Sequence, residues 1–478
     1  MSYRSAAVAA VAAVSVVASG AAVTLADRSP TALPTTHRSP GVVARLVAPA
    51  QATLACPAAP SVGETVTSLF AVSPVSKLSR APGGSLDLVP LGPTTRAVVK
   101  GVTEVGRQLH RTLRPEDPPA LLVSASGGFA PGAAAAASSV LSSRRSSGLA
   151  ATSCGPGAND WWFSAVDTSV GARSRLFLSN PTPAVAVVDL ALFGPRGAIE
   201  REGQRGIAIA PLSQWRINLA RFAPGVGTLT VNARAVRGSI VAAVLTTKLR
   251  GISTAGSEWV APSAGPSNDL VINAAPQGKQ QRLVLTNTSS REALAHVRVF
   301  DASGTFTATA LGDLRIDPGG VVTTDLAAIT NGATTGIRVA GNVPLTGAIT
   351  TKTSGRAEDF TVSTSSEPIT DPAVVWLLPD AELSLLLTTP KPAGGSVRVA
   401  SYDAAGTRVR SQIVTVRGEA TTRWEPQKPE DTAYLVLSVR TGTGIRGMAN
   451  YRSADGTASV PVVSGVWSIQ RPTVLPGP

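Results

Sequence analysis

The stretch that decides the fold reads Arg175-Leu-Phe-Leu-Ser-Asn-Pro181, because related stretches recur twice further along the chain. A Val-rich segment and the turn Gly194-Pro-Arg-Gly197 follow it. The second copy reads Arg282-Leu-Val-Leu-Thr-Asn287 and leads to the turn Asp301-Ala-Ser-Gly304. The third copy, at residues 383–406, lacks the Asn and ends in a similar turn. A pattern that recurs at a regular spacing indicates one supersecondary unit copied along the chain.

Within each copy, short segments of alternating apolar and polar residues are separated by Gly- and Pro-containing turns, which is typical of strands. Each copy holds roughly seven to nine such strands, the number found in an immunoglobulin-like sandwich. The sequence therefore predicts an all-β protein with three tandem immunoglobulin-like β-sandwich repeats. A similar strand precedes each repeat, and a fourth one, Gly465-Val-Trp-Ser468, follows the last. The alternative is a closed β-propeller in which each repeat is split into two blades.

The chain has 478 residues, which is enough for several domains. The predicted organisation is a signal peptide or membrane anchor at 1–26, a linker at 27–50, a β-containing N-terminal region at 51–157, and β repeats at 158–262, 263–371 and 372–472.

The N-terminus predicts export. Arg4 precedes a nearly uninterrupted apolar stretch at residues 6–26, and Asp27-Arg28 restores charge after it. This order is typical of a signal peptide, although the stretch is also long enough to span a membrane. The sequence alone supports both a cleaved signal and a retained anchor.

The chain contains two cysteines, Cys56 and Cys154. In an exported protein, an even pair most simply forms a disulfide. Because the two residues lie near the ends of the N-terminal region, we expect the bond to staple a segment that has a thin core of its own.

Charge and motifs exclude several function classes. The net charge is +13, but the arginines are dispersed along strands, so the sequence predicts no nucleic-acid partner. His37, His110 and His296 stand outside any recognisable nucleophile or metal motif, so we expect no catalytic residue, no metal and no cofactor. The dipeptide Glu358-Asp359 is interpreted as a pair of solvated loop charges.

Tryptophans recur at the strands that begin or end a repeat, which favours a packing role. Trp161 and Trp162 are the adjacent pair and the candidate ligand contacts, since an exposed ring stacks on a sugar face. Alternation along a strand predicts that one of the two rings points inward and the other outward.

Several of these features together resemble an exported, actinobacterial-type envelope protein family of unknown function. They are Cys56-Pro57, Cys154, Trp161-Trp162-Phe163, the strand 176–181 and the turn 194–197. The resemblance implies an envelope-associated protein and brings no catalytic residues.

Two function classes follow. The first is a non-catalytic cell-envelope scaffold or binding protein, with an envelope protein or cell-wall glycan as partner and the membrane as a further contact if the N-terminal segment stays uncleaved. The alternative is a cell-wall glycan-binding or glycan-active protein.

Overall fold

The protein is all-β in the computed structural model, which describes residues 44–60, 65–80, 83–92, 99–113, 119–143, 146–353, 358–427 and 429–472. Residues Leu46–Arg471 form one compact unit. The predicted signal peptide or anchor at 1–26 and most of the linker at 27–50 lie outside the described residues. Within the described part of the chain, no helix combines the length and the apolar character that a membrane crossing requires.

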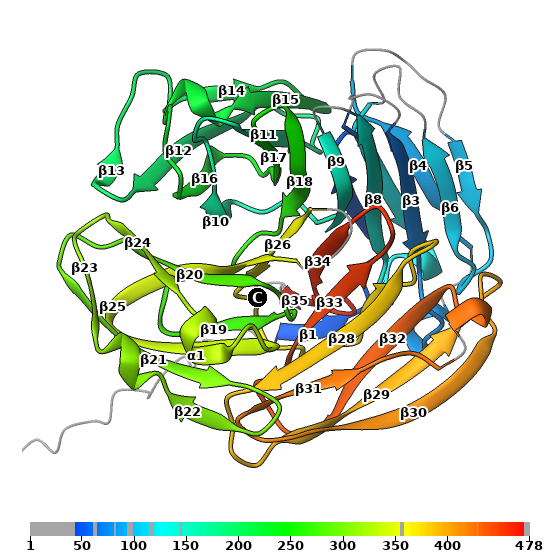
Figure 1. The fold of residues 1–478 in the computed structure, drawn as a ribbon. Coiled ribbons are helices and arrows are strands. Elements are labelled where there is room, and N and C mark those ends of the chain that lie inside the picture. Colours follow the sequence, from blue (N-terminus) through cyan, green and yellow to red (C-terminus); the bar gives the residue numbers. More distant parts are fainter. Residues whose placement is uncertain are drawn as a thin grey trace, which may run out of the picture. The chain divides into compact units, whose positions relative to one another are not determined.

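The strands form pairs of sheets, and the same strand order occurs four times (Figure 1). We call the four sheet pairs the first to fourth modules. In each module, one sheet has the order first, sixth, third and fourth strand, and the other has the order fifth, second, seventh and eighth.

The first module lies in the predicted N-terminal region, where the sequence did not predict a copy. One sheet consists of β2 (Gln51–Cys56), β7 (Leu121–Ser126), β4 (Leu86–Pro90) and β5 (Val99–Val102). The other consists of β6 (Leu109–Leu113), β3 (Val66–Val72), β8 (Ala134–Ser143) and β9 (Ser146–Ser153). Two short 3-10 helices, η1 (Lys77–Arg80) and η2 (Gly127–Phe129), lie between its strands.

The second module begins at the predicted Trp-Trp-Phe strand. Its first sheet consists of β10 (Asp160–Val166), β16 (Leu229–Arg237), β12 (Ala186–Gly194) and β13 (Gly197–Ile199), with β14 (Ile207–Ile209) also paired to β12. Its second sheet consists of β15 (Ser213–Asn218), β11 (Ala172–Asn180), β17 (Val241–Arg250) and β18 (Ser253–Val260), and η3 (Leu219–Arg221) follows β15.

In the third module one long strand, β25 (Thr335–Lys352), serves as both the sixth and the seventh strand and joins the two sheets. It pairs with β19 (Ser267–Ala275), β21 (Ala293–Phe300), β20 (Gln280–Asn287) and β26 (Phe360–Thr364). The shorter elements are β22 (Thr305–Thr307), η4 (Thr309–Leu311), β23 (Leu314–Ile316), β24 (Val321–Asp325) and α1 (Ala327–Thr330).

The fourth module repeats the order without such a fusion. One sheet consists of β27 (Ala373–Trp376), β32 (Tyr434–Thr441), β29 (Gly395–Tyr402) and β30 (Arg408–Val416). The other consists of β31 (Ala420–Trp424), β28 (Glu382–Thr389), β33 (Arg446–Arg452) and β34 (Thr457–Pro461), and η5 (Pro429–Asp431) precedes β32. A separate two-stranded sheet pairs β1 (Ala44–Val47) with β35 (Ile469–Pro472).

The strand order differs from that of an immunoglobulin domain. Both folds pair the second strand with the fifth and the third with the sixth. Here the first strand joins the sixth and the seventh joins the second, so these two strands have exchanged sheets. A closed propeller is not shown, because the two sheets of each module pack face to face and bury their apolar sides together. The predicted repeat boundaries stay predictions.

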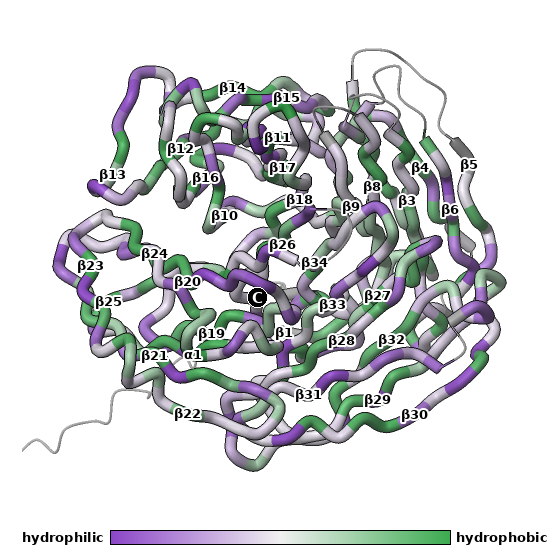
Figure 2. Tube along the Cα trace, viewed as in Figure 1, coloured by the Kyte–Doolittle hydropathy of each residue, from purple (hydrophilic) through white to green (hydrophobic). Residues whose placement is uncertain are grey.

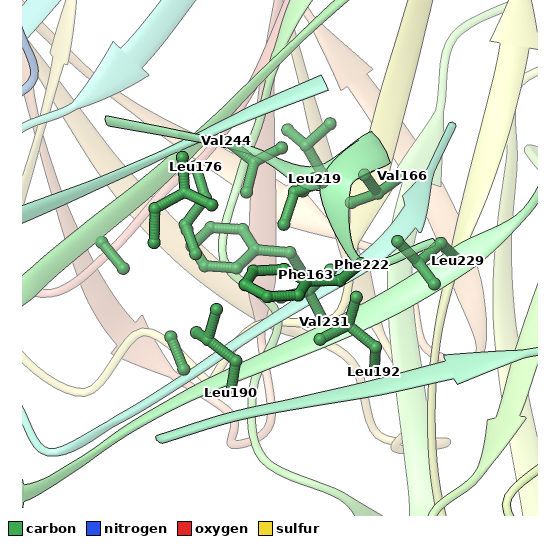
Figure 3. Packing of buried hydrophobic residues seen from close by; sticks show 14 of the residues in the cluster. Phe163, Val166, Leu176, Leu190, Leu192, Leu219, Phe222, Leu229, Val231 and Val244 are labelled. Carbon is green, nitrogen blue, oxygen red and sulfur yellow. The ribbon is translucent and has the colours of Figure 1, made fainter. Parts of the chain in front are cut away.

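Alternation along the strands builds these cores (Figure 2). In the second module, Phe163 of β10 and Phe222 after η3 lie among aliphatic side chains from both sheets (Figure 3). The same apolar cluster continues into the third module through Phe360 and Val362. A second cluster joins the first module to the fourth, with Phe70 stacked on Trp376. The modules therefore share buried surface.

The Asn of the repeated motif has a structural role. The Asn180 side chain donates to the backbone oxygens of Ala184, Ile209 and Ala210, and its Oδ1 accepts from the backbone N–H of Thr182. Asn287 repeats these bonds in the third module, with Arg291, Ile316, Asp317 and Ser289 as partners. The motif thus ties the end of the second strand to the loops beside it.

Candidate functional site

The last strands of the four modules meet. β9 lies beside β18 and β34, and β26 lies beside the same two strands, so each of the four contacts two others (Figure 1). We call this place the four-strand junction. It contains two buried carboxyl groups, Asp359 and Glu258, which are 1% and 0% exposed.

The Asp359 carboxylate holds the junction together. Its Oδ1 accepts from the backbone N–H groups of Ser257 at 3.2 Å and Phe360 at 2.9 Å. Its Oδ2 accepts from those of Leu149 at 3.3 Å and Thr457 at 2.9 Å. Each of the four modules therefore supplies one donor to a single side chain. Burial nevertheless raises the pKa of Asp359 to about 7, against the lowering effect of these four bonds.

Three glycines make room for this carboxylate. Gly148, Gly256 and Gly456 stand immediately before the residues that donate from the other three modules. A Cβ at Gly256 or Gly456 would lie 2.1 Å from an Asp359 carboxylate oxygen, and one at Gly148 would lie 2.9 Å away. Glycine is required at these positions because Asp359 occupies the space.

Glu258 is the second buried carboxyl group of the four-strand junction. Its Oε1 accepts from the backbone N–H of Ser459 at 3.0 Å, while its Oε2 has no partner among the described residues. Burial raises the pKa of Glu258 well above its usual range, and the nearby Asp359 raises it further.

A cavity of about 430 Å³ with a mixed polar and apolar lining lies at the seam between the third and fourth modules. One wall comes from Thr353 after β25 and Thr361 of β26, and the other from β28, β33 and β34 of the fourth module. Leu386, which also lines this cavity, packs against Ala274 and Met448, so an apolar cluster joins the two modules beside it. We call this the seam cavity.

Four residues that line the cavity each have one buried polar atom without a hydrogen-bond partner among the described residues: Thr361 Oγ1, Ser384 Oγ, Asn450 Nδ2 and Thr457 Oγ1. Buried polar groups are nearly always bonded, and exceptions call for an explanation. Their gathering around one cavity makes it the candidate binding site. Sequence reasoning missed these residues because single Thr, Ser and Asn residues in strands carry no distinctive signal.

Cys56 at the end of β2 and Cys154 after β9 form a disulfide, the pair that the sequence predicted. Beside it, the backbone N–H of Ala55 donates to the oxygen of Gly155 at 2.8 Å. The bond therefore joins the first and last strands of the first module.

Trp161 and Trp162 are both partly buried, and both pack against the apolar cluster of the second module. Trp161 Nε1 donates to the oxygen of Ile240, and its ring also packs against apolar residues of the first module. Trp162 Nε1 donates to Asp160, and its ring stacks on Phe193. The first module covers the face of β10 that the alternating pattern had suggested would be exposed to solvent. The role of Trp161 and Trp162 in ligand binding stays a prediction.

The remaining titratable candidates are dispersed. His296 pairs with Asp313 on the surface, and Glu358 pairs with Arg250. The interpretation of Glu358-Asp359 as solvated charges fits Glu358 and is wrong for Asp359. Across the described residues, no group of three His, Cys, Asp or Glu side chains is placed to hold a metal ion.

A comparison with known protein families identifies the family of this chain. A family model matches residues 111–427, from β6 of the first module to just beyond β31 in the fourth. The chain belongs to DUF5719, a family of unknown function. The resemblance to a family of unknown function is thereby confirmed. No curated protein matches this DUF5719 member.

One solved structure, a biofilm-associated protein BSP domain, covers 88% of the chain and 96% of its own length at 8% identity. Its TM-score is 0.12, so the likeness carries no argument.

Proposed function

We propose that this protein is a non-catalytic scaffold or binding protein that works outside the cytoplasm, in the cell envelope. The disulfide supports this location, since such bonds form and persist in oxidising compartments. The predicted signal peptide or anchor at 1–26 would deliver the chain there and, if it stays uncleaved, would hold it at the membrane.

The observation that carries the proposal is the four-strand junction. Asp359 accepts one N–H from each module, and apolar clusters cross the module boundaries. Such a unit suits a rigid platform that presents loops to a partner, because loops on a fixed framework are where recognition usually resides.

Cell-wall glycan is the second candidate partner beside an envelope protein. The seam cavity favours it, because its described lining includes threonine, serine and asparagine side chains beside apolar ones. The two buried carboxyl groups support no glycosidase proposal, since Asp359 is committed to four backbone donors and neither residue lines the cavity.

The test is cell fractionation combined with a wall-binding assay on the full chain. We expect the protein in the envelope fraction with Cys56 and Cys154 oxidised, as shown by thiol labelling and mass spectrometry. Purified cell wall, or an envelope protein, should retain it without release of soluble sugar. Free thiols and a cytoplasmic location would contradict the location, and sugar release abolished by replacing one acidic residue would contradict the non-catalytic role.

A further inference from the structure

We propose that β30 of the fourth module pairs with β30 of a second copy of the chain, so that the two copies share one continuous sheet. This inference goes beyond the proposed function, because it names an interaction surface and its partner and does not depend on the cellular location. It starts from the exposed edge of one sheet.

β30 (Arg408–Val416) is the edge strand of its sheet. It pairs with β29 on one side, and no described strand pairs with its other side. Figure 1 shows β30 in orange at the rim of the fourth module. An edge of this kind presents a row of backbone N–H and C=O groups, and another extended chain can pair with that row.

The other modules have much shorter strands at the equivalent place. The fourth strand is β5 in the first module, with four residues, and β13 in the second, with three. In the third module this place belongs to β22, which also has three residues. Very short edge strands are one way in which proteins prevent edge-to-edge pairing. β30 has nine residues, so the fourth module lacks this protection.

The composition of β30 suits pairing. Residues 411–416 read Ser-Gln-Ile-Val-Thr-Val and contain no charge, no Pro and no Gly. Uncharged segments of this length with high β propensity are typical of strands that add to one another. Arg408 and Arg410 are the charged residues of the strand, and both lie at its N-terminal end. A bulge at Val409 separates them, so the regular part of the strand is 410–416.

The pattern along this regular part identifies a second copy as the partner. Val414 and Val416 belong to the buried core, whereas Ser411, Ile413 and Thr415 are all exposed on the other face. Ile413 is 66% exposed and lies at the middle of 410–416. A hydroxyl residue stands two positions before it and another two positions after it. The exposed face therefore reads the same in both directions.

A palindromic edge is complementary to itself. In an antiparallel pair of two β30 strands with a two-fold axis at Ile413, the two Ile413 side chains lie opposite each other. Ser411 of each copy then lies opposite Thr415 of the other. Apolar pairs and pairs of hydroxyl residues that face each other across strands stabilise a sheet. A single register thus satisfies both kinds of pair.

The same register keeps the arginines of the strand apart. The net charge of +13 on each chain opposes self-association. Arg410 would lie opposite Val416 of the other copy, so the two Arg410 residues are separated by about 20 Å along the strands. Arg398, which lies opposite Ile413 on β29, pairs with Glu419 at 3.7 Å. The central part of the paired edges is therefore free of like-charge contacts between the strands.

Sedimentation velocity of the purified full chain at increasing concentration measures the association. We expect a reversible monomer–dimer equilibrium with a Kd of about 10 to 100 µM, because one strand pair buries less area than a standard interface. Ile413→Lys would place two ammonium groups opposite each other, so the Kd of this variant should rise at least tenfold. Ile252→Lys is the matched control, since Ile252 is 94% exposed in the turn between β17 and β18. It should leave the Kd unchanged.

Cysteine cross-linking tests the register. Opposite residues in an antiparallel pair have Cα atoms about 4.5 to 5.5 Å apart, which is within the reach of a disulfide. Ile413→Cys should therefore cross-link to its own copy under mild oxidation. Thr415→Cys should not, because its counterpart lies about 13 Å away along the strand, but it should cross-link to Ser411→Cys in a mixture. The native Cys56 and Cys154 are bonded to each other, so they do not compete.

The proposal is overturned if the chain stays monomeric above this Kd range, if Ile413→Lys associates as the wild type does, or if Thr415→Cys cross-links to itself as readily as Ile413→Cys. A monomeric chain that retains a different envelope protein, with retention lost in Ile413→Lys, would also overturn the second copy as the occupant of this edge. None of these outcomes bears on the envelope location, which fractionation tests separately.

Discussion

At the scale of single residues, Asp359 bonds to the backbone of all four modules. Its two oxygens accept four backbone N–H groups, so every donor needs an oxygen opposite it. Asp359→Asn replaces one oxygen by an N–H donor and leaves two backbone donors unpaired. We expect the free energy of unfolding at pH 8 to fall by about 2 to 4 kcal/mol, measured by chemical denaturation.

Asp313→Asn is the matched control, because Asp313 is exposed and pairs with a surface histidine. Its effect should stay within about 0.5 kcal/mol. Equal stability of Asp359→Asn and the wild type would show that the junction does not depend on the carboxylate.

The same residue predicts a pH dependence. The pKa of Asp359 is about 7 in the folded chain, against an ordinary value of 3.8. Asp359 therefore binds a proton more tightly in the folded state than in the unfolded state. Its contribution to the free energy of unfolding is complete below a pH of about 4 and is lost as the pH rises through about 7. The wild type should therefore be more stable at pH 5 than at pH 8.

Denaturation at several pH values checks this dependence. The free energy of unfolding should change less with pH in Asp359→Asn than in the wild type. The pH dependence that remains in the variant belongs to Glu258, whose pKa is also raised by burial. Identical slopes in the variant and the wild type would assign the pH dependence to other groups.

At the scale of elements, the glycines before the last strands decide whether those strands can meet. Gly456→Ala would place a Cβ 2.1 Å from Asp359 Oδ2 and 2.6 Å from the backbone nitrogen of Leu149. We expect this change to lower the free energy of unfolding by about 2 kcal/mol or more. Gly265→Ala, at a glycine with open space around it, should change it by less than about 1 kcal/mol.

A double-mutant cycle sharpens this prediction. Asp359→Ala removes the oxygen that the new methyl group meets, so the double variant should cost less than the sum of the two single changes. Strict additivity would contradict the steric explanation.

The disulfide is the second prediction at this scale. It closes a loop with a sequence separation of 98, so the loop-entropy relation gives a contribution of about 4 to 5 kcal/mol. The Cys56→Ser, Cys154→Ser double variant should lose stability of this order in chemical denaturation, and limited proteolysis should cut residues 51–157 first. The reduced wild type serves as the comparison, and a variant as stable as the oxidised wild type would contradict the stapling role.

Sequence patterns predicted strands and missed the contacts between modules. The repeated motif was visible because Asn180 and Asn287 make the same bonds at equivalent places. At the end of the second strand, the first and fourth modules have Ser73 and Thr389 instead of Asn, and their hydroxyls bond the backbone oxygens of Phe129 and Thr443. The first module was therefore missed as a copy. Asp359 was misread because nothing in its neighbourhood shows that donors from distant strands surround it.

At the scale of the whole described unit, the modules should unfold together. Apolar clusters pass from the second module to the third and from the first to the fourth. We expect a single transition for the full chain in differential scanning calorimetry. The isolated segment 263–371 should melt with lower cooperativity, because it loses three of the four N–H donors to Asp359. Several separate transitions in the full chain would show that the modules are independent.

The single carboxylate at the junction also restricts how the array can be altered. If all four modules were identical, each would have the same residue immediately before its N–H donor at the junction. Four glycines would leave the donated N–H groups without an acceptor, and four aspartates would not fit where the junction has room for one. A symmetric assembly of one module, or a chain in which one module is exchanged for a copy of another, could not close in this way. The modules share a strand order, yet they are no longer interchangeable parts.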